Sequence, residues 1–147
     1  MEFRPITDHA QFHRLLTEYY RDGADADTPQ ETIDGVIRYL FDLYTQDDIS
    51  GCIAWEGEPV GFALWQLDTP DSPFSQKPGW GTILEIGLTP KFRGRGYGSS
   101  LVLHAENAMQ AQNRYVCAYG PAEGFWKKCG YRDSGELATN GLKIFIK

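Results

Sequence analysis

The sequence predicts an α+β fold: a six- to seven-stranded mixed β-sheet flanked by about four helices. Apolar residues recur at a helical spacing in some segments and alternate with polar residues in others. The extended segments are grouped in hairpins and also joined by helices, which is typical of a mixed sheet covered by helical layers. With 147 residues, 41% of them hydrophobic, the chain has enough apolar material for one core. We therefore expect a single domain over residues 1–147.

The first half of this order is an extended stretch, two helices and a hairpin. Residues 3–6 form the stretch, and Thr7-Asp8 can cap a helix over residues 9–21, whose apolar positions have helical spacing. Thr28-Pro29-Gln30-Glu31 has the pattern of a capping box that begins the second helix. Two apolar runs follow at 49–56 and 59–67, joined by Glu56-Gly57-Glu58, which predicts a hairpin.

The second half begins with an irregular loop at residues 69–80, which holds three prolines and is long enough to suggest a functional role. A strand is expected at 82–89, where Pro90 stops it, and a helix from about 97 to 112. A strand at 115–119, a short helix at 121–128 and two final strands on either side of Gly141 complete the order.

Charge and cysteine content exclude several classes of protein. The formal net charge is −6, whereas a nucleic-acid-binding domain usually carries a basic excess. The three cysteines are widely spaced and include no C-x-x-C pair, so neither a disulfide framework nor a zinc site is expected. The N-terminus lacks a signal-peptide pattern, and no apolar run approaches the ~20 residues of a membrane span. We expect a reduced, cytoplasmic, metal-free protein.

The segment that indicates chemistry is Arg93-Gly94-Arg95-Gly96-Tyr97-Gly98, between the strand at 82–89 and a helix. Glycines let backbone N–H groups converge on one point, the helix adds its positive N-terminal end, and the arginines add charge, so the loop is suited to phosphate. A Walker loop would need a lysine after the glycines, and a dinucleotide fingerprint would need a different spacing. The remaining alternatives are a turn without a ligand and an RNA-binding Arg-Gly segment.

Two motifs in this order resemble the GNAT superfamily, the Gcn5-related N-acetyltransferases. Arg93-x-x-Gly96-x-Gly98 resembles the family's Q/R-x-x-G-x-G/A pyrophosphate motif, and the preceding Ile86–Pro90 resembles its V-x-P strand end. Residues 119–131 resemble the later N-x-x-A-x-x-x-Y-x-K-x-G-F segment at matching spacing. The order of elements agrees as well, so the resemblance covers essentially the whole chain.

The resemblance implies acetyl-CoA as cosubstrate, bound where the strands at 82–89 and 115–119 splay apart. The pantetheine arm of coenzyme A would pair with the backbone of the first strand, and the backbone N–H of Leu88 would polarise the acetyl carbonyl. Trp126 would pack on the pantetheine. The full set of expected cofactor-binding residues is Ile86, Gly87, Leu88, Arg93, Gly94, Arg95, Gly96, Tyr97, Gly98, Ser99 and Trp126.

Glu85 is the expected general base, because it is the only charged residue between Thr82 and Pro90. A carboxylate in an apolar strand tends to have a raised pKa, which suits proton abstraction from an amine near neutral pH. It could also orient the substrate ammonium without moving protons. The tyrosine often proposed in the family as the acid is replaced by Trp126, whose indole cannot act as an acid. Tyr119 is therefore the expected acid, with Tyr131 as a second choice and water as a third.

The function implied is acetyl transfer from acetyl-CoA to a primary amine of a small molecule or peptide, with no nucleic-acid or membrane partner, in a monomer or homodimer. The alternative is a catalytically impaired acyl-CoA sensor, because Tyr119 and Trp126 depart from the family pattern. Residues in regions that line the acceptor site in this family are Tyr19, Tyr20, Asp25, Asp27, Trp65, Asp68 and Phe74.

Overall fold

A computed structural model describes all residues, 1–147, as one seven-stranded sheet in the order β1-β2-β3-β4-β5-β7-β6. The strands are β1 (Glu2–Arg4), β2 (Ser50–Trp55), β3 (Pro59–Leu67), β4 (Gly81–Leu88), β5 (Arg114–Ala118), β6 (Arg132–Leu137) and β7 (Lys143–Ile146). All neighbours are antiparallel except β4 and β5, which are parallel. The expected mixed sheet with seven strands is confirmed.

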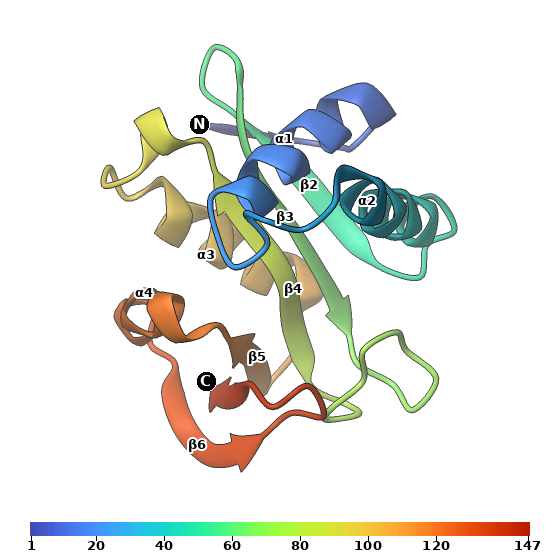
Figure 1. Cartoon of the computed structure of the whole chain (residues 1–147). Helices are drawn as coiled ribbons and strands as arrows, with labels where there is room; N and C mark the ends of the chain where they lie inside the picture. Colours follow the sequence, from blue (N-terminus) through green and yellow to red (C-terminus); the bar gives the residue numbers. More distant parts are fainter.

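Helices cover both faces of the sheet (Figure 1). Helices α1 (His9–Arg21) and α2 (Gln30–Thr45) bury their apolar faces on one side, where Phe12 and Ile37 pack with residues of β2 and β3. Helix α3 (Tyr97–Met109) and the short α4 (Glu123–Lys128) cover the other side, where Leu101 and Trp126 join the larger core cluster. Single-turn helices at Pro90–Phe92 (η1) and Gly120–Ala122 (η2) precede α3 and α4. No helix is long and apolar enough to span a membrane.

The helix caps differ in how well the sequence predicted them. Asp8 caps α1 as expected, because its side chain accepts a hydrogen bond from the Ala10 N–H at 2.9 Å. The capping box at Thr28 is wrong: α2 begins after Pro29 with no side-chain cap, and the Thr28 hydroxyl donates to Asp25 instead. Helix α3 also ends three residues early, at Met109, because Gln110 takes a left-handed conformation.

The β3–β4 loop is held together by Asp68, which is 1% exposed. Its Oδ2 accepts the backbone N–H groups of Gln76 and Lys77 at 2.9 and 2.8 Å and the Tyr115 hydroxyl at 2.6 Å. Although burial acts to raise it, the pKa of Asp68 is lowered overall by these donors and Ser75. Gln76 then binds Thr139 through both ends of its side-chain amide, which links the loop to the β6–β7 connection. Asp68 is therefore a structural anchor of this loop.

Replacing Asp68 with alanine should lower the free energy of unfolding by about 2–4 kcal/mol, because it leaves buried N–H and O–H donors without an acceptor. Urea unfolding followed by circular dichroism measures the change. Asp71→Ala is the control, since Asp71 is exposed in the same loop and holds no other group. Equal stability of the two variants would show that Asp68 does not anchor the loop.

Candidate active site

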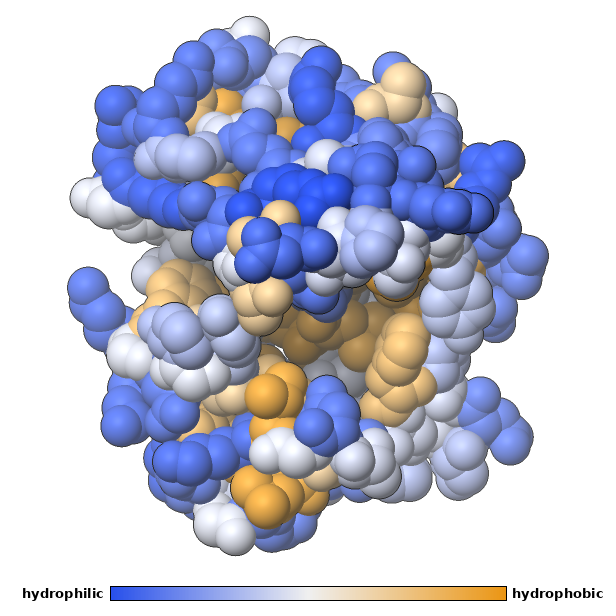
Figure 2. All heavy atoms as spheres, viewed as in Figure 1, coloured by the Kyte–Doolittle hydropathy of each residue, from blue (hydrophilic) through white to orange (hydrophobic).

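Strands β4 and β5 pair only where they begin, at Gly81 with Arg114 and Thr82 with Tyr115. Beyond these pairs the strands diverge, and the second half of β4 is unpaired on that side. The Thr89 N–H donates a hydrogen bond to the Val60 carbonyl of β3 at 2.8 Å. Successive N–H groups of a strand point in opposite directions. The Leu88 N–H therefore points away from β3 and into the gap. Figure 2 shows a hollow across the middle of the molecule, with an apolar floor, a hydrophilic upper rim and a lower rim of mixed hydropathy. The expected splay between these strands is present.

A β-bulge in β4 aims Glu85 at the α1 face of the sheet. The register with β3 passes from Leu64–Glu85 to Trp65–Ile83, so Leu84 is the extra residue. Ile83 and Ile86 consequently lie on the α3 face although they are three residues apart, while Leu84 packs on the α1 side. Strict alternation would have placed Glu85 beside Ile83, on the α3 face. The bulge re-aims it, as bulges near functional sites often do.

Glu85 lies among tyrosines of α1. Burial raises the pKa of its carboxyl to about 7, the hydroxyl groups of Tyr19 and Tyr20 oppose the rise, and the negative charge of Asp25 adds to it. The Tyr19 ring can approach because Gly87 lies beneath it; a Cβ on Gly87 would come within 2.8 Å of that ring and 2.7 Å of the Phe62 ring. A carboxylate with such a pKa is suited to accept a proton near neutral pH.

The raised pKa of Glu85 should appear in the stability of the protein. The folded state binds the proton more tightly than the unfolded state, whose ordinary value is 4.5. The stabilisation is therefore complete below pH 4.5 and is lost as pH rises through about 7, by about 3 kcal/mol in total. Glu85→Gln should remove this loss, so that the variant gains stability over the wild type between pH 5 and pH 8. Denaturant unfolding at the two pH values checks it, with Glu18→Gln, at an exposed position of α1, as the control.

The glycine-rich loop presents a row of free donors. No backbone N–H from Gly94 to Ser99 donates a hydrogen bond, and the first one that does is that of Ser100, to the Gly96 carbonyl at 3.2 Å. Gly94 and Gly96 are both left-handed, with φ of 75° and 82°, and nothing lies within 4 Å of where their side chains would start. These open N–H groups stand at the N-terminus of α3, so the residues fit a pyrophosphate.

The cationic side chains of this region differ in whether an acidic side chain already neutralises their charge. Arg95 makes no ion pair and lies over the Phe92 ring, 5.4 Å from its centre. Lys91 pairs with Glu58 at 3.1 Å. Arg93, predicted with the phosphate-binding residues, turns its side chain away from the loop toward Leu88 and Asp22, and its own N–H bonds the Pro90 carbonyl. Arg95 is therefore the free cation of the loop.

The candidate acid Tyr119 and the aromatic residues of α4 follow β5 along the chain. Tyr119, directly after β5, is 42% exposed. Trp126 is 6% exposed and packs edge-on against Phe125 and Tyr131, inside the core. The Phe125 ring lies 2.9 Å from the position a Gly98 side chain would take, so it meets the N-terminus of α3. The sequence singled out Trp126, but of the two α4 aromatic residues it is Phe125 that reaches the N-terminus of α3.

Tyr131 is committed to a structural pair. Its hydroxyl donates to the buried carboxylate of Glu106 at 2.7 Å, and Lys147 binds the other oxygen at 2.9 Å. Burial and this carboxylate raise the pKa of Tyr131. The hydroxyl is thus engaged away from the β4–β5 gap, which removes the second choice for the acid.

The residues expected on the acceptor side separate into two groups. Tyr19, Tyr20 and Asp25 lie around Glu85, where their charges and hydroxyls act on its pKa. Trp65, by contrast, is buried in the core on the α3 face, with its ring against His104, and Phe74 packs on Tyr39 of α2. Asp27 is exposed in the loop between α1 and α2.

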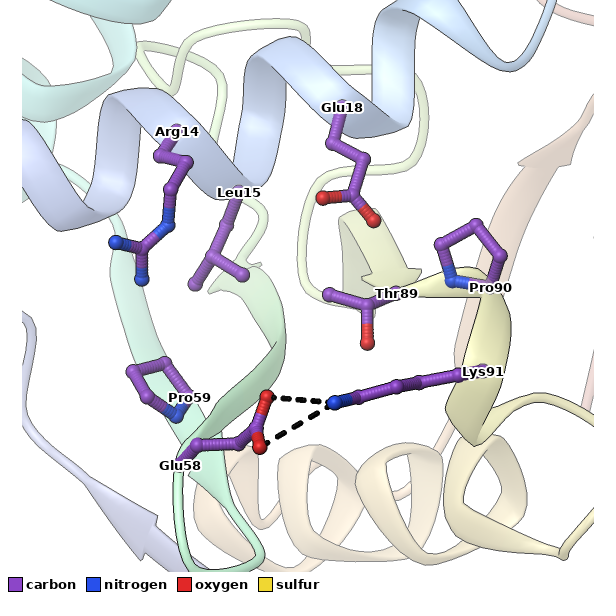
Figure 3. A pocket seen from close by; sticks show the side chains of 8 residues that line it. All are labelled: Arg14, Leu15, Glu18, Glu58, Pro59, Thr89, Pro90 and Lys91. Carbon is purple, nitrogen blue, oxygen red and sulfur yellow. Dashed lines mark hydrogen bonds and ion pairs between the residues drawn. The ribbon is translucent and has the colours of Figure 1, made fainter.

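A separate hollow of about 550 Å³ opens between α1 and the β2–β3 turn (Figure 3). It is lined by charged side chains such as Arg14 and Glu18, and by the Glu58–Lys91 ion pair. Neither Glu85 nor any free N–H of the glycine-rich loop lines it. The candidate base and the candidate phosphate-binding loop are therefore not located in this hollow.

Comparison with known proteins agrees with the geometry. The family described as "Acetyltransferase (GNAT) family" matches residues 9–131. Among curated proteins, no sequence matches that of this chain.

Solved structures share the fold at low sequence identity. An acetyltransferase from Thermus thermophilus is 20% identical, with a TM-score of 0.78 over 99% of this chain and 95% of that one. A GCN5-related N-acetyltransferase from Ralstonia eutropha is 22% identical, with a TM-score of 0.74 over 94% and 96%. PaiA N-acetyltransferase from Thermoplasma acidophilum, solved in complex with coenzyme A, is 17% identical, with a TM-score of 0.73 over 99% and 97%.

Proposed function

Since the chain belongs to the acetyltransferase (GNAT) family, we propose that it transfers an acetyl group from acetyl-CoA to a primary amine of a small molecule or peptide. The observation that carries the proposal is the position of Glu85. A carboxylate with a pKa of about 7 lies three residues from Leu88, whose N–H points into the gap between β4 and β5. Transfer from a thioester to an amine requires a base and an oxyanion donor, and these two groups lie three residues apart on one strand.

The donor site fits coenzyme A in two parts. The free N–H groups from Gly94 to Ser99 would hold the pyrophosphate. The unpaired edge of β4, from Ile86 to Leu88, would hydrogen-bond the pantetheine arm as an added strand would. Phe125 stands beside the α3 N-terminus and would cover the arm, with Trp126 behind it.

Each group has one task in the proposed reaction. Acetyl-CoA supplies a thioester carbonyl, and the Leu88 N–H stabilises the negative charge that develops on its oxygen. Glu85 takes a proton from the acceptor ammonium, directly or through water, so that the nitrogen lone pair can form the C–N bond. The C–S bond then breaks, and the sulfur takes a proton from the Tyr119 hydroxyl or from water. The nitrogen gives up its second proton, which restores the Tyr119 hydroxyl or goes to water. Burial keeps the pKa of Glu85 high, and the hydroxyl groups of Tyr19 and Tyr20 hold it below the value that burial alone would give.

Acetylation of a panel of primary amines, with release of the CoA thiol as the signal, tests the proposal. Calorimetry with CoA measures the donor site independently. The wild type should bind CoA and release thiol only when an amine is present. Absence of CoA binding would exclude the proposal altogether.

A sensor of acyl-CoA is the second candidate, and the observation that favours it is the burial of Trp126 where the family often has a tyrosine. In a sensor, CoA would bind and raise the melting temperature of the protein. Adding an amine would then cause no release of the CoA thiol. The same two measurements therefore separate the candidates.

A further inference from the structure

The side chain of Arg93 bridges two parts of the site that are far apart in sequence. Its Nε and Nη2 donate to the carbonyl oxygen of Leu88 at 3.2 and 3.1 Å. Its Nη1 binds the carboxylate of Asp22. One planar guanidinium thus fixes the end of β4 and the end of α1 in a single geometry, which an ammonium group could not do.

Asp22 is the C-cap of α1, and Tyr19 and Tyr20 lie in the turn before it. Both tyrosines act on Glu85. In Figure 1 the connection that follows Asp22 passes in front of β4. Fixing Asp22 therefore fixes the part of α1 that covers Glu85.

The rest of this connection is bound to α1 through hydrogen bonds of Arg21. The Arg21 side chain donates to the carbonyl groups of Asp25, Ala26 and Thr28 at 3.4, 3.0 and 2.5 Å and to Oε1 of Gln30 at 2.9 Å. Arg93 then ties this ordered connection to β4. The two arginines together join the α1–α2 connection, on the side proposed for the amine, to the end of β4, on the side proposed for the thioester.

The same contacts make Arg93 a poor ligand for phosphate. The Asp22 carboxylate neutralises its charge, and a phosphate placed there would meet that carboxylate. Arg95, two residues along the same loop, makes no ion pair. The positive charge available to a pyrophosphate therefore belongs to Arg95.

On the basis of the proposed function, we propose that Arg93 is a positioning residue, which with Asp22 locks the α1–α2 connection onto the end of β4 and so aligns the Leu88 N–H with Glu85. The first residue of the glycine-rich motif would then serve the geometry of acyl transfer, and the phosphates would depend on the N–H groups that follow it.

The test uses two donors, acetyl-CoA and S-acetyl-pantetheine, which lacks the nucleotide and its pyrophosphate. Arg93→Ala should lower kcat with both donors by on the order of 10- to 100-fold, since small misplacements of reacting groups have effects of this size. Asp22→Ala should act in the same direction, and the double variant should be little worse than either single one, because the two residues act as a unit. Arg95→Ala, the matched arginine, should raise KM for acetyl-CoA much more than for S-acetyl-pantetheine.

Amide hydrogen exchange of residues 19–30 gives a readout that does not depend on turnover. Exchange there should accelerate in Arg93→Ala and Asp22→Ala and should not change in Arg95→Ala. Where alanine prevents folding, Arg93→Lys and Asp22→Asn replace it, because each keeps the size of the side chain but removes the fork or the charge.

Two results would overturn the proposal: loss of rate confined to acetyl-CoA in Arg93→Ala together with tighter CoA binding in Asp22→Ala, or unchanged exchange of residues 19–30. A wild type that binds no CoA would instead reject the proposed function, while the exchange measurement would still decide the role of Arg93.

Discussion

Replacing Glu85 with glutamine should lower kcat/KM for amine acetylation by about 100- to 10,000-fold, the range that a positioned general base contributes. Glutamine keeps the size of the side chain and its hydrogen-bonding oxygen but cannot accept the ammonium proton. The wild-type rate should fall with decreasing pH below about 7, as Glu85 becomes protonated. That limb of the profile should be absent from the residual activity of the variant. Steady-state rates from pH 5.5 to 9 measure both effects.

The affinity for CoA separates a catalytic effect from a damaged fold. Glu85 faces α1, whereas the proposed phosphate donors are the N–H groups at the start of α3, so Glu85→Gln should bind CoA as the wild type does. Glu18→Gln removes one carboxylate from an exposed position of α1 and should keep the wild-type rate. A Glu85→Gln variant that is as fast as the wild type would remove Glu85 from the mechanism and leave the family membership untouched.

The sequence predicted the elements well because their signals are local. The helical spacing of α1, the prolines of the loop before β4 and the turn at Gly57 each depend on a few neighbouring residues. The glycine-rich loop is local as well, and its glycines take left-handed conformations that leave the N–H groups of the loop free. The capping box at Thr28 shows the limit of such patterns, since Asp25, three residues earlier, accepts the hydroxyl instead.

Features set by contacts between distant segments could not be predicted in this way. The bulge at Leu84 depends on the register between β3 and β4, and no residue pattern within β4 predicts it. The alternation of β4 alone would have placed Glu85 on the α3 face, so the prediction of Glu85 as the base depended on its charge and on the family resemblance. Arg93 is similar: its partner Asp22 lies 71 residues away, and the motif gives no sign of the pair.

Valine at Gly96 should weaken CoA binding by on the order of 100-fold or more, since it removes the conformation on which the donor loop depends. Gly96 is the N-cap of α3 with φ 82° and ψ 1°, and a β-branched residue is strained there by about 1–3 kcal/mol. The loop can relieve the strain only by rotating its peptide groups, which turns the N–H groups of Gly94 to Ser99 away from a common point. Calorimetry with CoA measures the loss.

The matched control is Gly57→Val in the β2–β3 turn, because Gly57 has φ 73° and, like Gly96, nothing within 4 Å of an added side chain. Both variants should show a similar fall in melting temperature, since the backbone strain is the same. Only Gly96→Val should also lose CoA, because only there do the rotated peptides belong to the phosphate site. Equal CoA affinity in the two variants would mean that the N–H groups of the loop are not what holds the pyrophosphate. The binding energy would then have to come from side chains such as Arg95. In that case the motif would predict the shape of the turn but not the groups that bind the pyrophosphate.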